Sequence, residues 1–359
     1  MPATTHREYN ANTEAKEVAK EFAHIISGKT VVITGVNRRG IGFATAEAFA
    51  SQAPAHLIVT GRTMSKLQES IDALRAQFPD VDYRTLHIDL SNQHSVRTAA
   101  AELLSWADIP TIDILVNNAG VSLFPERTLS VDGIEVTFAT NHVGHFLFTN
   151  LIMPKIIEAA QRNPKGRTRI INVSSGSPMV ARMRWSDINF EQKSKDLPEA
   201  ERPLPAIHKA WGVDNTEDMS YIPLEAYNVS KVANVLFGIG INKRLYDKYG
   251  ILSLGLHPGV IETELGRNST PEVAAWLKGM KDRGHYTVKS FGAGASTSLV
   301  AALDPELGVG ETRNSKENYG AFLADCQINE QAQPLAVSSL EAEKLWKLSQ
   351  RLVKQNFEW

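Results

Sequence analysis

Short apolar runs alternate with longer amphipathic segments along most of the chain. Thr30–Thr34 is a β-branched run, and Phe43–Ala50 repeats apolar residues at helical spacing. The first pattern is typical of a buried strand, and the second is typical of a helix. Strands that alternate with helices of this length predict an α/β fold with a doubly wound parallel sheet. Further strands are predicted at 56–60, 83–88, 112–116, 169–173 and 252–256, with helices at 43–50, 64–78, 93–106, 134–160 and 227–249.

Two amphipathic segments flank the alternating region. Apolar residues recur over 13–27 and over 338–353, so we expect a helix at each place that packs on the main body. We therefore predict an N-terminal helical extension at 1–28 and one domain at 29–359. Residues 176–226 interrupt the alternation with aromatic, charged and proline-rich sequence, which suits an ordered surface flap.

Composition favours a small-molecule partner. The 359 residues carry a net charge of −2 with a pI near 6.6, which gives no electrostatic footprint for nucleic acid or an anionic membrane. The single cysteine, Cys326, excludes an intramolecular disulfide and is predicted to be a packed thiol. The ten histidines show no metal-ligand spacing, so no metal is expected.

The sequence also lacks the marks of export or membrane insertion. No long apolar run opens the chain, and the longest such run, near 235–241, is too short to span a bilayer. The expected location is cytoplasmic. The oligomeric state stays open, a homodimer included.

A glycine-rich turn joins the first strand to the first helix of the alternation. Gly35, Gly40 and Gly42 lie where amide groups at a helix N-terminus can hold a phosphate. A Walker phosphate loop would need Lys after the second glycine, but Ile41 and Gly42 follow it. A nucleotide triphosphatase is therefore disfavoured.

The second strand ends at Arg62, where a dinucleotide-binding unit meets the adenosine ribose. An acidic residue there would bind a free 2′-hydroxyl, whereas arginine pairs with a 2′-phosphate. Arg38 and Arg39 add positive charge nearby. The three arginines together favour NADP, although each alone could equally be solvated surface.

Tyr227 and Lys231 lie one helical turn apart and can point into one site. A nearby ammonium would lower the tyrosine pKa from about 10 and make the phenol a better acid and base. Other polar residues follow strand ends, which meet at one edge of a parallel sheet. We expect a site at this edge, formed by Gly35, Arg62, Asp89, Asn117, Ser175 and Pro258 with the Tyr227 helix.

These motifs resemble the short-chain dehydrogenase/reductase family from about Lys29 to Asp325. The matching pieces include Thr34-Gly35…Gly40-Ile-Gly42, Asn117-Asn-Ala-Gly120 and Tyr227-x3-Lys231. The resemblance is to the subgroup with retinol dehydrogenases, the WW-domain-containing oxidoreductase and fungal reductases of secondary metabolism. It implies a Rossmann fold and a catalytic tetrad of Asn141, Ser175, Tyr227 and Lys231. It also implies NADP(H) binding by Gly35, Asn37, Arg38, Arg39, Gly40, Ile41, Gly42, Arg62, Asp89, Leu90, Asn117, Ala119, Gly120, Tyr227, Lys231, Pro258, Gly259, Val260 and Thr263.

The expected activity is that of an NADP(H)-dependent ketoreductase acting on a bulky, mainly apolar carbonyl or alcohol. Two segments contribute aromatic and apolar residues that would cover the site: Trp185, Phe190 and Trp211 in the flap, and Trp276 and Met280 after the sixth strand. Their alternative is packing against the body. The alternative function is a non-catalytic NADP-binding regulatory or scaffold protein of the same fold.

Overall fold

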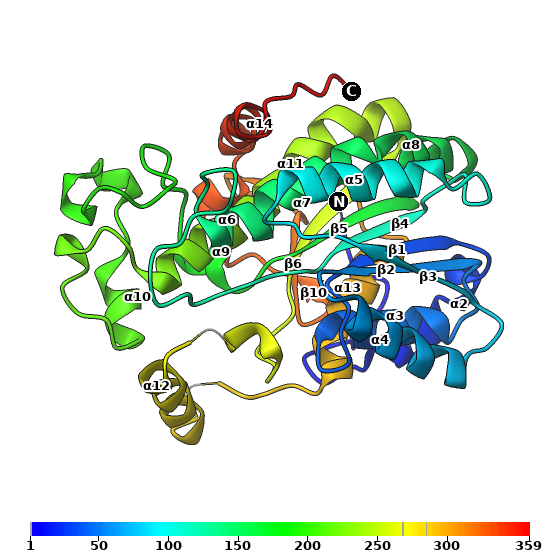
Figure 1. The fold of residues 1–359 in the computed structure, drawn as a ribbon, viewed down its shortest axis with the longest axis horizontal. Coiled ribbons are helices and arrows are strands. Elements are labelled where there is room, and N and C mark those ends of the chain that lie inside the picture. The colour runs from blue at the N-terminus through cyan, green and yellow to red at the C-terminus, as the bar shows by residue number, and fades with distance from the viewer. Residues whose placement is uncertain (1, 268, 285) are drawn as a thin grey trace.

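An eight-stranded sheet forms the centre of the molecule (Figure 1). The computed structural model describes residues 2–267, 269–284 and 286–359. Neighbouring strands are parallel except for the antiparallel pair at one edge, β9 and β10. The order is β10-β9-β6-β5-β4-β1-β2-β3. The bounds are β1 Thr30–Thr34, β2 His56–Gly61, β3 Asp82–His87, β4 Ile114–Asn117, β5 Thr168–Val173, β6 Ile251–His257, β9 Phe322–Ala324 and β10 Gln327–Ile328.

The chain winds outward from β1 in both directions. It adds β2 and β3 on one side, then crosses over and adds β4, β5 and β6 on the other side. This confirms the doubly wound parallel sheet predicted from the alternating pattern. Ligands of such sheets bind beyond the carboxyl ends of the strands where the order reverses, which here is the junction of β1 and β4.

Helices cover both faces of the sheet and create two separate cores. Val32 points into one core, and its neighbours Val31 and Ile33 point into the other, as the alternation of side chains along a strand requires. One core lies under α5, α7, α8, α11 and α14, and the other lies under α1, α3, α4 and α13. The bounds are α1 Ala15–Glu21, α2 Ala23–Ile26, α3 Ile41–Ala50, α4 Met64–Gln77, α5 Gln93–Ser105, α7 Gly144–Leu151, α8 Met153–Arg162, α11 Pro223–Tyr249, α13 Phe291–Leu303 and α14 Ser339–Val353.

Two predicted helices are broken in the structure. The N-terminal helix expected over 13–27 ends at Glu21 and restarts at Ala23. The helix expected over 134–160 comprises α6 (Val136–Phe138), a π turn (Ala139–Val143), α7 and α8. Pro154 lies in the first turn of α8, where its missing N–H costs no helical hydrogen bond, so the chain restarts there.

The flap, residues 176–226, forms an ordered lobe at one end of the molecule (Figure 1). It contains α9 (Ser177–Val180), α10 (Pro205–Ala210) and three short 3₁₀ turns, Ser194–Asp196, Glu199–Glu201 and Thr216–Asp218. A buried hydrogen bond joins His208 Nε2 of α10 to Glu225 Oε2 of α11 over 2.9 Å. The flap is thereby fixed to the start of the helix that carries Tyr227.

The C-terminal part adds α12 (Pro271–Asp282) and the hairpin of β7 (Glu311–Arg313) and β8 (Lys316–Tyr319). Cys326 is buried and donates to Ser296 Oγ, which confirms the packed thiol. Within the described part of the chain, no helix is both long and apolar enough to cross a bilayer.

Candidate active site

The glycine turn after β1 is shaped by two close backbone contacts. Gly35 has φ +72°, and a Cβ there would lie 2.6 Å from Ala119 Cα. A Cβ at Gly42 would lie 2.6 Å from Asn118 Nδ2 and 2.7 Å from the Gly35 carbonyl oxygen. Both distances are too short for a side chain. The two glycines therefore let the turn pack directly on the loop that follows β4.

The same turn presents the N-terminus of α3 to the sheet edge. Gly40 is the N-cap residue, Ile41 begins the helix, and Asn37 Oδ1 is buried without a hydrogen-bond partner among the described residues. Arg38 and Arg39 are exposed beside it, and the Arg38 guanidinium lies 4.5 Å from the centroid of the Phe43 ring.

Arg62 is exposed just after β2, where sequence predicted the adenosine end of a dinucleotide. Amides at a helix N-terminus with nearby arginines form an anion site. The glycine turn and the arginines therefore fit the phosphates of a nicotinamide dinucleotide.

Thr34, at the end of β1, connects the glycine turn to the centre of the site. Its Oγ1 accepts hydrogen bonds from the backbone N–H groups of Asn118 and Ala119, each at 2.9 Å, and lies 2.8 Å from His145 Nε2. His145 Nδ1 donates to the Asn141 carbonyl at 2.9 Å. Burial lowers the pKa of His145 to about 4, so the ring is neutral and its bare Nε2 accepts the Thr34 proton.

Asn141 lies in the π turn and is fully paired. Its Oδ1 accepts from Val121 N at 2.8 Å, while Nδ2 donates to Val121 O and to Ser230 Oγ at 3.0 and 2.9 Å. The Asn141 side chain thus fixes the loop after β4 to α11. Its place in a catalytic tetrad stays a prediction.

Tyr227 and Lys231 share one face of α11, as predicted. Lys231 Nζ lies 5.7 Å from the centroid of the Tyr227 ring and donates to the Val173 carbonyl at 2.8 Å. Burial lowers the Lys231 pKa to about 7. Burial raises the Tyr227 pKa to about 12, and a hydrogen bond with Ser175 acts in the opposite direction.

The predicted lowering of the Tyr227 pKa by Lys231 is therefore wrong for this structure. Both groups are taken out of water, and desolvation disfavours the phenolate and the ammonium alike. Tyr227 is protonated at neutral pH, the form that donates a proton.

Ser175 follows β5 and lies in a chain of hydroxyl groups. Its Oγ accepts from Ser177 N at 3.0 Å and lies 2.6 Å from Ser177 Oγ, which itself donates to Asn228 Oδ1 at 2.7 Å. Because Ser177 gives its proton to Asn228, it accepts the proton of Ser175. Ser177 and Asn228 thus orient the predicted catalytic serine, which sequence reasoning did not anticipate.

Comparisons with known proteins agree with this geometry. The pattern of the short chain dehydrogenase family matches residues 29–187. Oxidoreductase fscI of Fusarium equiseti is 40% identical over 251 residues, 70% of this chain and 94% of that protein. Retinol dehydrogenase 12 of Mus musculus is 30% identical over 331 residues, 91% of this chain and 87% of that protein.

The chain belongs to the short-chain dehydrogenase/reductase family. A crystal structure of an uncharacterised protein from Mycobacterium Paratuberculosis matches with a TM-score of 0.60 at 25% identity, covering 93% of this chain and 96% of that one. These findings confirm the resemblance to the family and to its retinol dehydrogenase and fungal relatives. Members of the family are oxidoreductases that use NAD(H) or NADP(H) and act on small-molecule substrates.

Several residues that the family pattern assigned to the cofactor have structural bonds in this chain. Asp89 Oδ1 accepts from the backbone and hydroxyl of Ser91. Asn117 Nδ2 donates to Thr149 Oγ1 and Asn172 Oδ1, so this side chain points into the sheet.

The other cofactor residues predicted on the strand-end loops lie at the carboxyl edge. A Cβ at Gly120 would lie 3.4 Å from Lys231 Nζ, and Leu90 packs against Gly144. The segment after β6 contains Pro258, Gly259 with φ +91°, and the exposed Val260. Thr263 Oγ1 accepts from Leu265 N at 3.2 Å.

The aromatic residues of the flap divide into two groups. Phe190 is fully buried in the core, and Trp185 packs on the core and donates to Glu341 Oε2 of α14. The expectation that these two line the substrate wall is wrong, because both complete the packing between the flap and the body. Trp211 and Trp276 stay 37% and 38% exposed and remain candidates for that wall.

The flap and α12 contact each other through one indole. Trp276 Cδ2 lies 3.2 Å from the position of a Cβ on Gly212, which has φ +79°. Residues just before α12 approach the catalytic centre, since Ser122 Oγ donates to the Leu265 carbonyl at 3.1 Å. The flap and α12 thus contact each other close to the segment that bonds to the loop after β4.

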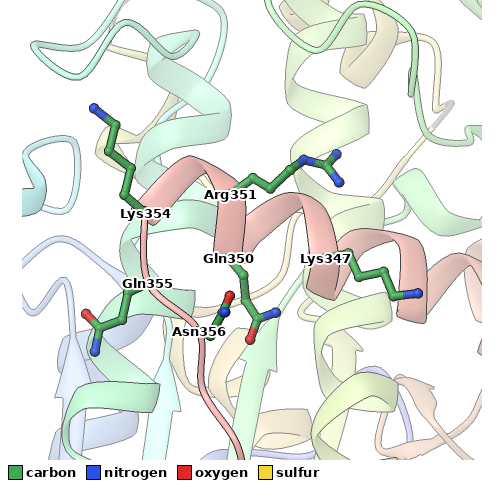
Figure 2. A pocket seen from close by; sticks show the side chains of 6 residues that line it. All are labelled: Lys347, Gln350, Arg351, Lys354, Gln355 and Asn356. Carbon is green, nitrogen blue, oxygen red and sulfur yellow. The ribbon is translucent and has the colours of Figure 1, made fainter.

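A surface hollow of about 500 Å³ lies elsewhere, along α14 (Figure 2). Lys347, Arg351 and Lys354 border it, but their charged ends point away from one another in Figure 2. The hollow therefore lacks converging groups and is separate from the catalytic residues.

Proposed function

We propose that this protein is an NADP(H)-dependent ketoreductase that interconverts a bulky, mainly apolar carbonyl compound and its alcohol. The observation that carries the proposal is the arrangement around Tyr227. A protonated phenol, the Ser175 hydroxyl and the Lys231 ammonium meet at the carboxyl edge of the sheet, next to a glycine turn that fits a dinucleotide.

The nicotinamide, when bound, supplies or accepts the hydride at the carbonyl carbon. In reduction the carbonyl π bond becomes an O–H bond. Tyr227 gives its proton to this oxygen, and its raised pKa keeps that proton available at neutral pH. With substrate bound, Ser175 would turn its hydroxyl proton from Ser177 Oγ to the same oxygen, where negative charge grows, which is the role of an oxyanion donor.

In this proposal Lys231 holds the nicotinamide ribose. Lys231 is only 3% exposed, and its Nζ donates to the Val173 carbonyl, so the side chain is fixed in place. After reduction, Lys231 would pass a proton to the Tyr227 phenolate and restore the phenol. Asn141 holds the π turn behind it.

The preference for NADP(H) rests on charge. Arg38, Arg39 and Arg62 are all exposed around the end of the turn, and no acidic residue follows β2 at the ribose position. A 2′-phosphate would gain charge-assisted hydrogen bonds there. One relative, Retinol dehydrogenase 12, has a name that denotes activity on an alcohol. The cytoplasmic location remains a prediction.

The apolar character of the substrate is supported by Trp211, Trp276 and Met280. Each is at least partly exposed, Trp211 in the flap and the other two in α12. Trp185 and Phe190 no longer contribute to this argument.

The rival function is a non-catalytic NADP-binding regulatory or scaffold protein. A binder has no need of a paired Tyr227 and Ser175. The test is NADPH oxidation, followed by absorbance, with a panel of carbonyl compounds graded by size and polarity. We expect turnover of large apolar ketones and a higher kcat/KM with NADPH than with NADH. Tight NADPH binding without turnover of any carbonyl would favour the rival.

A further inference from the structure

His257 ends β6 on the strand next to the one that carries Ser175. Leu256 pairs with Val173 across β5 and β6, and Ser174 N donates to the Leu256 carbonyl at 2.7 Å. Neighbouring strands lie about 4.8 Å apart, so the two residues leave the sheet side by side. The imidazole edge reaches the chain just after Ser175, since Nε2 lies 3.8 Å from the position of a Cβ on Gly176.

The hydrogen bonds of this histidine determine which nitrogen carries the proton. The Gly259 N–H donates to Nδ1 at 3.4 Å. Burial lowers the pKa of His257 to about 4, so the neutral ring keeps one proton, and that proton is on Nε2. Within the described part of the chain, Nε2 has no protein partner, and the residue is partly exposed. It is therefore a free donor beside the catalytic serine.

The surroundings keep His257 neutral and fixed. Lys289 and Asp325 form an ion pair of 2.6 Å nearby and act on the ring in opposite directions. The Lys289 chain packs against Gly259, where a Cβ would lie 2.6 Å from Lys289 Cε. A neutral N–H that is held in place can donate a hydrogen bond to a carbonyl oxygen.

We propose that His257 binds a second carbonyl oxygen of the substrate, one carbon removed from the carbonyl that reacts at Ser175 and Tyr227. The proposal rests on the proposed function and narrows its substrate class to β-dicarbonyl compounds with an apolar body. The second oxygen would lie on the side of Ser175 where β6 ends, the side from which the His257 ring approaches Gly176. His257 is thus a specificity-determining residue that sets which of the two carbonyls reacts.

The experiment compares two ketones of equal length on the full chain with NADPH. Ethyl benzoylacetate carries the second carbonyl oxygen, and hexanophenone replaces the ester atoms with methylenes. His257→Gln keeps an amide N–H near the position of Nε2, whereas His257→Asn is too short to reach it. The quantity measured is the ratio of kcat/KM for the ketoester to that for the ketone, which cancels effects common to both.

The ratio should be retained in the Gln variant and fall about threefold to tenfold in the Asn variant, the range that one neutral hydrogen bond produces. The loss should fall on the ketoester alone, with KM for NADPH unchanged. Equal ratios in both variants, or a weakened NADPH KM in the Asn variant, would overturn the proposal. Circular dichroism checks folding, and His257→Met replaces the Asn variant if that protein does not fold.

Failure of the proposed function would look different. If the wild type oxidises no NADPH with either ketone, calorimetric binding of the two ketones to the NADPH-saturated protein decides the role of His257. Weaker binding of the ketoester alone in the Asn variant supports the role, and equal binding by all forms excludes it.

Discussion

The glycine turn and the flap border the same site, yet they contribute to it by different means. Gly35 and Gly42 act through absent side chains, because any Cβ would collide with the loop after β4. The flap acts through side chains, and its large residues divide between the core, as Phe190 does, and the surface, as Trp211 does. Where the backbone itself forms the site, only glycine fits at the close contacts, whereas a wall formed by side chains can be made by many different residues. The cofactor side is therefore far easier to predict than the substrate side.

The largest effect is expected at Tyr227, the proposed proton donor between the cofactor side and the substrate side. Tyr227→Phe removes the acid and should lower kcat by about 10²- to 10⁴-fold, while NADPH affinity measured by fluorescence titration stays near the wild-type value. Tyr221→Phe is the matched control. It loses one bond from Oη to the Phe124 carbonyl within the flap region and should retain turnover. More than a tenth of the wild-type kcat in Tyr227→Phe would contradict the assignment.

The attachment of the flap should be the next most sensitive point. His208→Ala leaves the Glu225 carboxyl buried without its hydrogen-bond partner, which typically costs about 1–3 kcal/mol of unfolding free energy. Urea unfolding measures this loss. Asp218→Asn, which removes an exposed flap pair with Lys195, should leave the urea midpoint nearly unchanged. Similar losses in both variants would mean that the buried pair does not hold the flap.

The predicted preference for NADPH on the cofactor side can be tested at Arg62. Arg62→Asp should reduce or reverse the preference for NADPH over NADH, because each charge-assisted contact contributes about 1.5–3 kcal/mol. The ratio of kcat/KM for the two cofactors measures the change. Arg162→Asp, an equal charge change at the end of α8, should leave the ratio unaltered. A wild-type protein that uses both cofactors equally would disprove the preference.

The smallest effect is expected where the flap meets α12. Trp276→Ala removes a half-exposed indole that packs on Gly212, and KM for a large apolar ketone should rise about fivefold, the equivalent of roughly 1 kcal/mol of apolar contact. KM for a small ketone and for NADPH should stay constant. If KM rises equally for both ketones, the indole has only a structural role.

Much of the fold was predictable because strand and helix periodicity repeats over many residues. The π turn around Asn141 was missed, since apolar spacing does not distinguish it from a regular helix. Trp185 and Phe190 were misplaced for a related reason. An aromatic residue in an insertion packs wherever the body offers space, and that depends on distant residues such as Glu341.

The hydrogen bonds within the site also could not be predicted from the sequence. Thr34 and His145 lie far apart in the chain and meet only because β1 and α7 pack together. Ser177 and His257 could have been suspected only from their position in the sequence, close to the predicted Ser175 and Pro258. The high pKa of Tyr227 could not be foreseen, because it depends on burial.

The flap begins directly after Ser175 and ends directly before Tyr227. Its length can therefore change without changing the positions of these two residues. β5 and α11 pack on each other and fix the separation of its two ends. Closing a connection between fixed ends costs only about 0.6 kcal/mol more each time its length doubles. Segments here can lengthen, shorten or be exchanged while the acid and the serine keep their places. The substrate range can therefore change through the flap while the catalytic residues stay the same.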